Sequence, residues 1–359
     1  MGYKIGSFNL RNIGKTALGK KNDRDLQLIA QIIKREGFDV VAFQEVLSEG
    51  AAFSSPESDY IKKSILMELG GDWDFRWAKA ETQLNDTRNE GYAFLWNAKR
   101  LRPATTKTVD GKERVFSPRI CNLNKKDMMR RPYYARFTPV DTISGGPWIE
   151  LRLICVHTYF GKDDSEARKI RQNELDVLMK DIYPQIEDRR YGEYGNGMPS
   201  YTILMGDYNV ILHRKWKDKA FIDINKKRKE IGKSPLKKPA ELKTDCGDIL
   251  IATDWDNRKI RTVQDAFTTL HGKTENGQEE FDSRGYINDY DHFSFEESRF
   301  KDIFYRVRKV DAVRKYCKDS FETYYNKVSD HIPIMMEIEL KDSFILNEKD
   351  IQTKQEGEE

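Results

Sequence analysis

The chain has 359 residues, of which 38% are hydrophobic, 11% aromatic and 34% charged. These proportions indicate a soluble globular protein with a sizeable core, and no apolar run is long enough to cross a bilayer. The formal net charge of +3 is too small to indicate nucleic-acid binding by itself, so the position of the charges matters more than their sum.

Buried strands alternate with amphipathic helices along the chain, which predicts a mixed α/β domain. In chain order, the pattern predicts a strand at 3–10, a helix capped by Asn22 or Asp23 and ended by Gly37, a strand at 38–43, a helix at 61–69, strands at 91–96, 133–140 and 148–157, a helix at 165–183, and strands at 201–205, 291–295 and 332–340. The Ser-Gly-Gly-Pro turn at 144–147 predicts a hairpin between the strands on either side of it.

Five of the apolar runs end in polar residues that suit a metal ion or a phosphate. They are SFNLRN at 7–12, FQEV at 43–46, CVHTYF at 155–160, LMGDYN at 204–209 and VSDHIP at 328–333. Packing buries the bodies of strands and leaves their ends exposed, so polar groups that recur at strand ends are expected to converge on one cleft. The pattern predicts an active site.

The chemistry of these residues favours a hard divalent cation. Asp, Glu and Asn supply oxygen ligands, which suit Mg²⁺ or Mn²⁺, whereas zinc sites use more histidine and cysteine. Hydrolysis of a phosphodiester needs such a cation at a non-bridging oxygen and a base that removes a proton from water. The four cysteines form no CxxC pair, so we expect reduced thiols.

Eight segments stand in a fixed order from about Ser7 to about Leu340. They are SFNLRN, FQEV, EGYAFLW, RRPYYARF, CVHTYF, LMGDYN, DYDHFSF and VSDHIP. In this order they resemble the endonuclease/exonuclease/phosphatase superfamily, which includes deoxyribonuclease I. The resemblance implies an α/β fold, a four-layer sandwich in which two packed mixed β-sheets are flanked by helices, with the active site at one edge.

The resemblance also implies roles for the polar strand ends. Glu45, Asn9 and Asp330 would belong to the metal site, and Asn9 would also bind the phosphate. Asp207 and Asn209 would orient the attacked phosphate and the water, with Asn209 as a phosphate ligand.

Two histidines are each expected to pair with a carboxylate, because such a partner fixes the imidazole tautomer and raises its pKa. The resemblance makes His331 the general base and pairs it with Asp291, or with Asp289 if the strand register differs by two. It pairs His157, as the second catalytic histidine, with Glu90. We expect two histidine–carboxylate pairs on either side of one phosphate.

Three arginines complete the expected substrate contacts. The phosphate-binding arginine of the family falls on Arg131, with Arg130 as the alternative. Arg88 stands where deoxyribonuclease I has a tyrosine in the minor groove, which puts that mode of duplex binding in doubt, although an arginine can also enter a minor groove. His213, His271 and His292 are expected to be surface or structural residues.

A basic insertion follows the fourth polar strand end. Residues 214–243 contain twelve lysines and arginines against four aspartates and glutamates, a surplus larger than the net charge of the whole chain. It contains four candidate nucleic-acid contacts, although a solvated helix–loop insertion would look the same. These candidates are Lys226, Lys227, Arg228 and Lys229.

The expected organisation is one catalytic domain at 1–341 with the basic insertion at about 212–245, followed by a disordered acidic tail at 342–359. We predict a Mg²⁺- or Mn²⁺-dependent phosphodiesterase that acts as a nuclease, with endonuclease activity and DNA favoured over RNA. Because the start of the chain lacks the apolar region of a secretory signal, we expect a cytoplasmic protein without a membrane partner. The alternatives are a phosphatase or phosphodiesterase for a small or lipid-linked phosphate, and a catalytically silent binding domain.

Overall fold

The computed structural model describes the parts of the chain that build the fold. They are residues 2–15, 21–22, 24–47, 60–81, 90–107, 110–124, 127–140, 149–160, 165–189, 199–210, 226, 229–230, 232, 251–253, 258–263, 267–270, 286, 288–301 and 303–340.

The first of two large β-sheets is built from both ends of the described chain. Its strands are β1 (Gly2–Lys15), β2 (Lys21–Asn22), β3 (Val40–Leu47), β4 (Trp73–Lys79), β5 (Glu90–Asn97), β16 (Ile303–Lys309) and β17 (Ile334–Leu340). Their order is β16-β17-β1-β3-β5-β4, and β2 pairs with the end of β1. β1 and β3 are parallel, whereas β17 and β5 run antiparallel to their neighbours, so the sheet is mixed.

The second sheet comes from the middle of the chain. Its strands are β6 (Leu101–Pro103), β9 (Arg119–Ile120), β10 (Tyr133–Pro139), β11 (Glu150–His157), β12 (Ser200–Asp207), β13 (Ile251–Thr253), β14 (Lys259–Val263) and β15 (Asp291–Glu296). Their order is β13-β14-β15-β12-β11-β10-β6, with β9 beside β10. β11 and β12 are parallel at its centre, and β10 and β11 are antiparallel, as the predicted hairpin requires. A two-stranded ribbon, β7 (Thr105–Lys107) and β8 (Glu113–Val115), stands apart.

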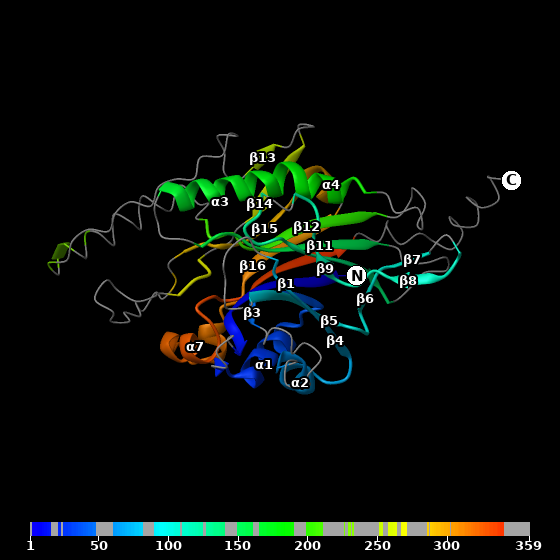
Figure 1. Ribbon diagram of the computed structural model, residues 1–359. Coiled ribbons are helices and arrows are strands. Elements are labelled where there is room, and N and C mark those ends of the chain that lie inside the picture. Colours follow the sequence, from blue (N-terminus) through cyan, green and yellow to red (C-terminus); the bar gives the residue numbers. More distant parts are fainter. Residues whose placement is uncertain are drawn as a thin grey trace.

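Helices cover the outer faces of both sheets and make four layers (Figure 1). The helices are α1 (Leu26–Glu36), α2 (Tyr60–Leu69), α3 (Ser165–Val177), η2 (Leu178–Ile182), α4 (Tyr183–Glu187), η4 (Glu297–Phe300), α6 (Ala312–Tyr316) and α7 (Phe321–Lys327). Apolar residues of α1, α6 and α7 pack on the first sheet, and those of α3, η2 and α4 pack on the second. The predicted fold class is confirmed. No helix in the described ranges is long and apolar enough to cross a membrane.

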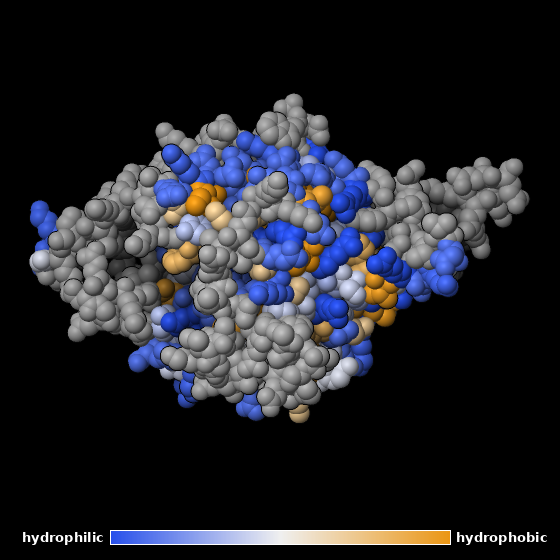
Figure 2. All heavy atoms as spheres, in the orientation of Figure 1, coloured by the Kyte–Doolittle hydropathy of each residue, from blue (hydrophilic) through white to orange (hydrophobic). Residues whose placement is uncertain are grey.

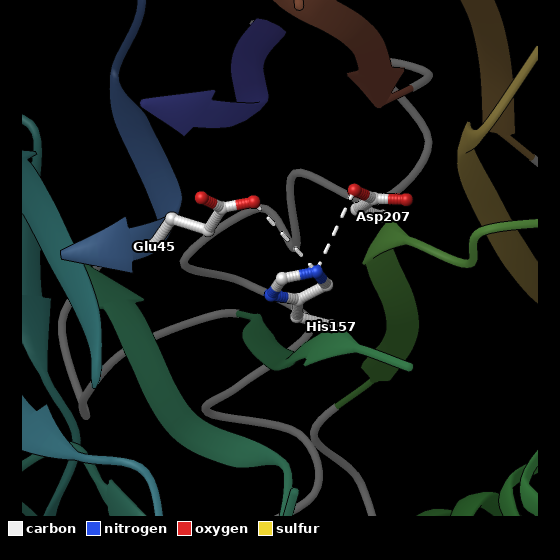
Figure 3. A group of neighbouring side chains, drawn as sticks. All are labelled: Glu45, His157 and Asp207. Atoms are coloured by element: carbon white, nitrogen blue, oxygen red, sulfur yellow. Dashed lines mark ion pairs between the residues drawn. The ribbon is translucent and has the colours of Figure 1, made fainter. Parts of the chain in front are cut away.

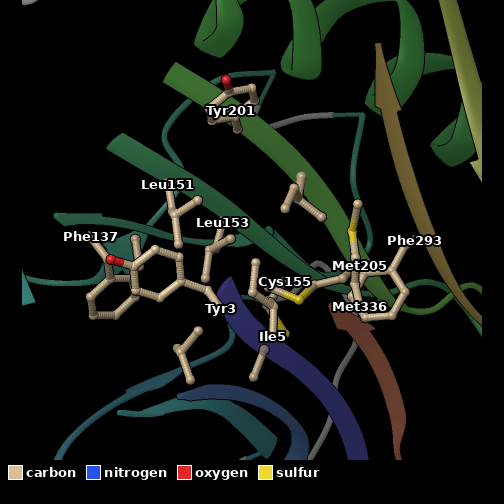
Figure 4. Close-up of a cluster of buried hydrophobic side chains, with 14 of the residues drawn as sticks. Tyr3, Ile5, Phe137, Leu151, Leu153, Cys155, Tyr201, Met205, Phe293 and Met336 are labelled. Atoms are coloured by element: carbon tan, nitrogen blue, oxygen red, sulfur yellow. The ribbon is translucent and has the colours of Figure 1, made fainter. Parts of the chain in front are cut away.

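A third apolar cluster fills the space between the two sheets (Figure 4). Tyr3 and Ile5 from β1 face Leu151, Leu153 and Cys155 from β11 across this space. All five side chains are buried. Burial of large apolar side chains stabilises a fold by about 1.5–3 kcal/mol each, so this layer fixes how the two sheets stack.

The first helix corrects one prediction. Its N-cap is Asp25, whose carboxylate accepts a hydrogen bond of 2.9 Å from the Leu28 amide, and not Asn22 or Asp23. Asn22 lies in β2, paired with β1, which delays the start of the helix, and Asp23 lies outside the described residues. Gly37 ends the helix at φ 71°, as predicted, because glycine adopts this left-handed conformation without strain.

The long helix predicted at 165–183 is interrupted. α3 passes at Leu178 into the π-helical turn η2, and α4 follows from Tyr183 to Glu187. Pro184 lacks the N–H that would donate to Lys180 in a regular helix, so the backbone widens before it.

Candidate active site

The strand pairing brings five of the predicted site residues to one edge of the sandwich. In the first sheet, parallel pairing aligns Asn9 of β1 with Gln44 of β3, the residue before Glu45. In the second sheet, parallel pairing aligns His157 of β11 with Asp207 of β12, which in turn pairs with Asp291 of β15. Parallel strands end at the same edge, and β15 begins there because it runs antiparallel.

The segment before β17 reaches the same edge because β17 runs antiparallel to β1. The Ser329 hydroxyl donates a hydrogen bond of 2.7 Å to the Asn9 carbonyl and accepts one of 3.1 Å from the His331 amide. Ser329 is fully buried. It ties the loop that contains His331 directly to β1.

The backbone at Glu45 leaves the regular strand conformation. Glu45 has φ 57°, and the pairing of β3 shifts register beside it, against β1 after Asn9 and against β5 after Phe43. A residue other than glycine in this region is strained, and such strain is found at functional sites where the surroundings enforce it. The bulge lets both Gln44 and Glu45 turn towards the space between the sheets, which regular alternation would forbid.

Asn9 connects the two sheets at the site. Its fully buried side-chain amide donates hydrogen bonds of 3.0 Å to Glu45 Oε1 and of 3.0 Å to Asp207 Oδ2. Its carbonyl Oδ1 accepts a hydrogen bond of 2.9 Å from the Arg11 amide. Asn9 therefore holds two carboxylates side by side.

His157 is paired with Glu90, as the sequence predicts. Glu90 Oε1 lies 2.5 Å from His157 Nδ1, and Arg130 approaches the other oxygen of Glu90 at 3.1 Å. All three side chains are buried. Burial lowers the pKa of His157, but Glu90 and, at longer range, Asp207 outweigh it, so the pKa is raised above its usual value.

His331 is paired with Asp291, at 2.8 Å between Nδ1 and Oδ2. Its other nitrogen, Nε2, lies 3.6 Å from Asp207 Oδ2. Burial lowers the pKa of His331, but Asp291 and Asp207 outweigh it and place the pKa well above its usual value. Asp291, not the alternative Asp289, makes the contact with His331.

Three side chains could hold a metal ion together (Figure 3). One ligand atom each from Glu45, His157 and Asp207 lies within 4.8 Å of the others. Burial raises the pKa of Glu45, and Glu90 and Asp330 raise it further against the opposing effect of His157. Burial likewise raises the pKa of Asp207. A half-buried and a buried carboxylate held this close are an environment that a divalent cation would neutralise.

Asp330, the third predicted metal-site residue, is half-buried at the edge of this group. Its Oδ2 lies 3.7 Å from Arg11 Nε, and the Arg11 guanidinium stacks 3.5 Å over the ring of Tyr325. Asp330 is near enough to Glu45 to raise the pKa of that carboxyl group.

Asn209 follows Asp207 at φ 49°. Its backbone amide donates a hydrogen bond of 2.9 Å to Asp207 Oδ1, and its side-chain amide donates one of 3.0 Å to the Thr158 carbonyl. Asp207, Asn209 and the end of β11 are thus locked together.

The two adjacent arginines have different surroundings. Arg130, the alternative, contacts Glu90 and donates to the Thr158 carbonyl at 3.3 Å. Arg131, the first choice, donates to Asn122 at 3.0 Å and pairs with Glu81. The structure therefore brings Arg130, rather than Arg131, to the histidine–carboxylate pair.

Two buried residues that fix the chain around the site, Glu174 and Ser329, were not predicted from the sequence. Glu174 of α3 is fully buried and accepts hydrogen bonds from the amides of Met129 and Tyr159, at 2.8 and 2.6 Å, so it fixes the chain on both sides of the site. In the sequence, the only sign of this role is that Glu174 directly precedes Leu175, a residue of the apolar face of the predicted helix. Ser329 lay inside a recognised motif, but its backbone bonds depend on the loop conformation.

The remaining predicted contacts are only partly described. Lys226 and Lys229 are exposed, whereas Arg88, Lys227 and Arg228 lie outside the described residues, as do His213, His271 and the tail. His292 is buried, with Nε2 at 3.1 Å from the Val210 carbonyl, which agrees with a structural role.

The arrangement of the two histidines suits proton transfer. His331 and His157 are each fixed by their own carboxylate through Nδ1, and both Nε2 atoms lie within 4 Å of Asp207 Oδ2, at 3.6 and 3.8 Å. Such a fixed tautomer suits general acid–base catalysis.

Comparisons with known proteins agree with this architecture. The sequence profile of the Endonuclease/Exonuclease/phosphatase family matches residues 6–219, which confirms the resemblance drawn from the motifs. A search of curated proteins found no match.

Solved structures with a similar fold cover nearly the whole chain. An endonuclease/exonuclease/phosphatase family protein from Bacteroides thetaiotaomicron is 13% identical, with a TM-score of 0.46 over 95% of this chain and 98% of that one. TDP2 from Caenorhabditis elegans is 12% identical, with a TM-score of 0.49 over 94% and 74%. A humanized D. rerio TDP2 is 14% identical, with a TM-score of 0.48 over 94% and 99%. At these identities and scores the likeness carries no information about substrate.

Proposed function

Because the chain belongs to the endonuclease/exonuclease/phosphatase family, we propose that it hydrolyses phosphodiester bonds of nucleic acid, as an endonuclease that favours DNA over RNA. Enzymes of this family are metal-dependent phosphoesterases and nucleases. The observation that carries the proposal is the meeting of two histidine–carboxylate pairs at one aspartate, Asp207, beside the Glu45 carboxylate.

His331 acts as the general base. Asp291 binds its Nδ1 proton and leaves Nε2 free to take a proton from the attacking water. Asp207 lies 3.6 Å from Nε2, close enough to orient that water. Asn209, held by Asp207 and Thr158, orients the phosphate from the neighbouring position.

His157 carries positive charge towards the phosphate. Glu90 favours its protonated form, and Arg130 lies behind the pair. A cationic imidazole with Nε2 towards the site stabilises the negative charge that develops on the phosphate oxygens, and it can protonate the leaving oxygen. Asn9 binds the same phosphate, and Arg131, which contacts Asn122 and Glu81, is proposed as a further phosphate ligand.

Glu45 is the principal residue to hold Mg²⁺ or Mn²⁺, with Asn9 and Asp330 around it and Asp207 within reach. The largely oxygen-donor set with two carboxylates of raised pKa fits a hard divalent ion. When bound, such an ion supplies a positive charge at the phosphate oxygens.

Residues 1–341 are proposed as one catalytic domain, which the pairing of β1 with β17 supports. The basic insertion is proposed to contact the backbone of DNA through Lys226, Lys227, Arg228 and Lys229, and Arg88 to contact DNA at the site. Lys226 and Lys229 are exposed, which this role requires.

The decisive experiment is a substrate panel. Purified protein is incubated with supercoiled plasmid, linear duplex, single-stranded DNA and RNA, each with Mg²⁺, with Mn²⁺ or with chelator. Cleavage of plasmid in metal, its loss in chelator and its loss in folded His331→Ala are expected. General-base removal costs about 10²- to 10⁴-fold in rate. Near-normal cleavage by folded His331→Ala would exclude the mechanism.

The panel also includes small and lipid-linked phosphomonoesters and phosphodiesters. The alternative function, a phosphatase or phosphodiesterase for such substrates, uses the same catalytic residues. Turnover of a small phosphate without cleavage of any nucleic acid would replace the nuclease proposal with that alternative.

A further inference from the structure

One aromatic side chain stands exposed beside the site. Among the described residues, four large hydrophobic side chains are exposed: Met67, Val115, Phe160 and Phe304. Three of them lie on α2, β8 and β16, and Phe160 alone follows a site strand, three residues after His157. Phe160 is 65% exposed. The coloured part of the surface in Figure 2 is mostly hydrophilic with small hydrophobic patches. A single exposed apolar side chain is common on a protein surface, so it is the position of Phe160 just after a site strand that matters.

The backbone that leads to Phe160 is held by the site itself. The Thr158 amide donates a hydrogen bond of 3.0 Å to the Asp207 carbonyl, and the Thr158 hydroxyl donates to the Tyr208 carbonyl. The Tyr159 amide donates a hydrogen bond of 2.6 Å to the buried Glu174 carboxylate. Consecutive Cα atoms are about 3.8 Å apart, so the Cα atom of Phe160 lies at most about 11 Å from that of His157.

We propose that Phe160 is a stacking platform for the nucleobase next to the attacked phosphate. This inference rests on the proposed nuclease function and names the part of the substrate that the site recognises. In the proposed mechanism His157 faces the phosphate, and the backbone hydrogen bonds of Thr158 and Tyr159 fix the start of the segment that leads to Phe160.

The chemistry of the side chain selects the ligand. A phenyl ring offers an apolar face and no hydrogen-bonding group, so it binds a flat apolar surface and does not distinguish one base from another. It therefore contributes to affinity for any base sequence. A base presented to this ring must be unstacked from a neighbouring base, because stacking uses the face of the base.

The test is a thermodynamic cycle between the protein and the substrate. One oligonucleotide has a single cleavable phosphodiester with a base on each side, and its partner has abasic residues at those two positions. For wild type and Phe160→Ala we measure KM and kcat on both. Phe160→Ala is expected to raise KM roughly 5- to 100-fold on the substrate with bases, with kcat changed little. On the abasic substrate the two proteins should be equal.

Three further measurements sharpen the result. Phe160→Trp, which keeps an aromatic ring, should have the low KM of wild type. Phe304→Ala, which removes another exposed phenylalanine, should leave the KM unchanged. In chelator, an oligonucleotide with 2-aminopurine beside the cleavable bond should lose fluorescence on binding wild type but not Phe160→Ala.

Failure of this inference is distinct from failure of the nuclease proposal. An unchanged KM in Phe160→Ala, or an equal loss on the abasic substrate, would overturn the stacking role while the nuclease activity stands. Absence of cleavage of every nucleic acid by wild type would overturn the nuclease proposal, and unquenched 2-aminopurine would then overturn the stacking role separately.

Discussion

The Asp207 side chain contacts two asparagines and both histidines of the site. It accepts hydrogen bonds from Asn9 and Asn209, and it lies 3.6 Å and 3.8 Å from the Nε2 atoms of His331 and His157. Burial raises its pKa, whereas both histidines lower it. Its charge therefore depends on theirs, and the site titrates as a group.

The first prediction concerns the pH profile of kcat/KM at saturating metal. Asp291 raises the pKa of His331, which must be neutral to act as base, so Asp291→Asn should move the acidic limb to lower pH and reduce the rate. Glu90 raises the pKa of His157, which must be protonated, so Glu90→Gln should move the alkaline limb to lower pH.

The matched control for these variants is Glu337→Gln, which removes the charge of a half-buried carboxylate on β17 that pairs with Arg308. Neither limb should move in this control. If neither Asp291→Asn nor Glu90→Gln shifts its own limb, the roles assigned to the two pairs are wrong.

The second prediction concerns Gly206, directly before Asp207. Its φ is 145°, and a Cβ atom there would lie 2.0 Å from the Val156 carbonyl oxygen. Gly206→Ala should destabilise the fold by at least about 1–3 kcal/mol, measured by urea unfolding. Gly71→Ala is the control, because a Cβ at Gly71 meets no atom within 4 Å and the residue has ordinary φ. Equal stability of the two variants would contradict the expected clash of a Cβ atom at Gly206 with the Val156 carbonyl.

At the scale of elements, Glu36 joins three of them. Glu36 is the last residue of α1. Its carboxylate contacts Lys315 and Tyr316 of α6, each at 2.8 Å, and Arg308 of β16 at 3.3 Å. Burial raises the pKa of Glu36, but the hydrogen bonds and charges of these partners outweigh it and lower the pKa below its ordinary value of 4.5.

The third prediction follows from the sign of this shift. A carboxylate with a lowered pKa stabilises the fold above its unfolded-state pKa, and this contribution disappears as pH falls through the folded-state pKa. Glu36→Gln should therefore cost about 1–3 kcal/mol at pH 7 and progressively less below about pH 4.5, measured by thermal unfolding at several pH values. Glu337→Gln, whose carboxylate is more exposed, should cost less than about 1 kcal/mol. A cost for Glu36→Gln that does not change with pH would exclude the charge as its cause.

The fourth prediction concerns the basic insertion. If Lys226, Lys227, Arg228 and Lys229 neutralise phosphates, replacing all four with Gln should weaken duplex binding and reduce its salt dependence by roughly 0.9 log unit per lost contact. Binding is measured by fluorescence anisotropy in chelator over a range of salt. Replacement of the exposed Lys99 and Lys112 is the control and should leave the slope unchanged. The same slope in all three proteins would leave the insertion as a solvated surface.

At the scale of the whole molecule, the two sheets bring carboxylates together that would repel each other in the absence of a cation. Glu45 comes from the first sheet and Asp207 from the second, and Asn9 bridges them. The raised pKa of each means that its charged form destabilises the folded protein at neutral pH. Metal binding should therefore stabilise the whole sandwich.

The fifth prediction tests this with a readout other than activity. Mg²⁺ or Mn²⁺ should raise the Tm of wild type, with a stabilisation of about 2.7 kcal/mol at a hundredfold excess over Kd. Glu45→Gln should raise the Tm in chelator, because it removes a carboxylate whose raised pKa shows that its charge is unfavourable in the folded protein, and should lose most of the response to metal. Glu337→Gln should respond like wild type. A full metal response in Glu45→Gln would place the ion elsewhere.

Hydrophobic patterns predicted a mixed α/β domain and eight of its strands, four in each large sheet. The reason is that alternation and helical spacing are local, and parallel strands must end at one edge. The four-layer sandwich and the carboxylate partners of His157 and His331 came from the family resemblance of the ordered motifs. The edge strand β4 was missed although Trp73, Phe75 and Trp77 alternate with polar residues. β16 was missed because the exposed Phe304 interrupts the alternation of apolar and polar residues along it.

Tertiary structure alone decided the details on which catalysis depends. The register shift that turns Glu45 inward, the choice of Arg130 over Arg131 at Glu90, and the burial of Glu174 all depend on how one segment packs against another far along the chain. Neighbouring residues do not encode these contacts, because the energy that enforces a strained or buried polar group comes from the surrounding structure. The sequence determined which residues reach the edge of the sandwich, and packing determined which of them face the same point.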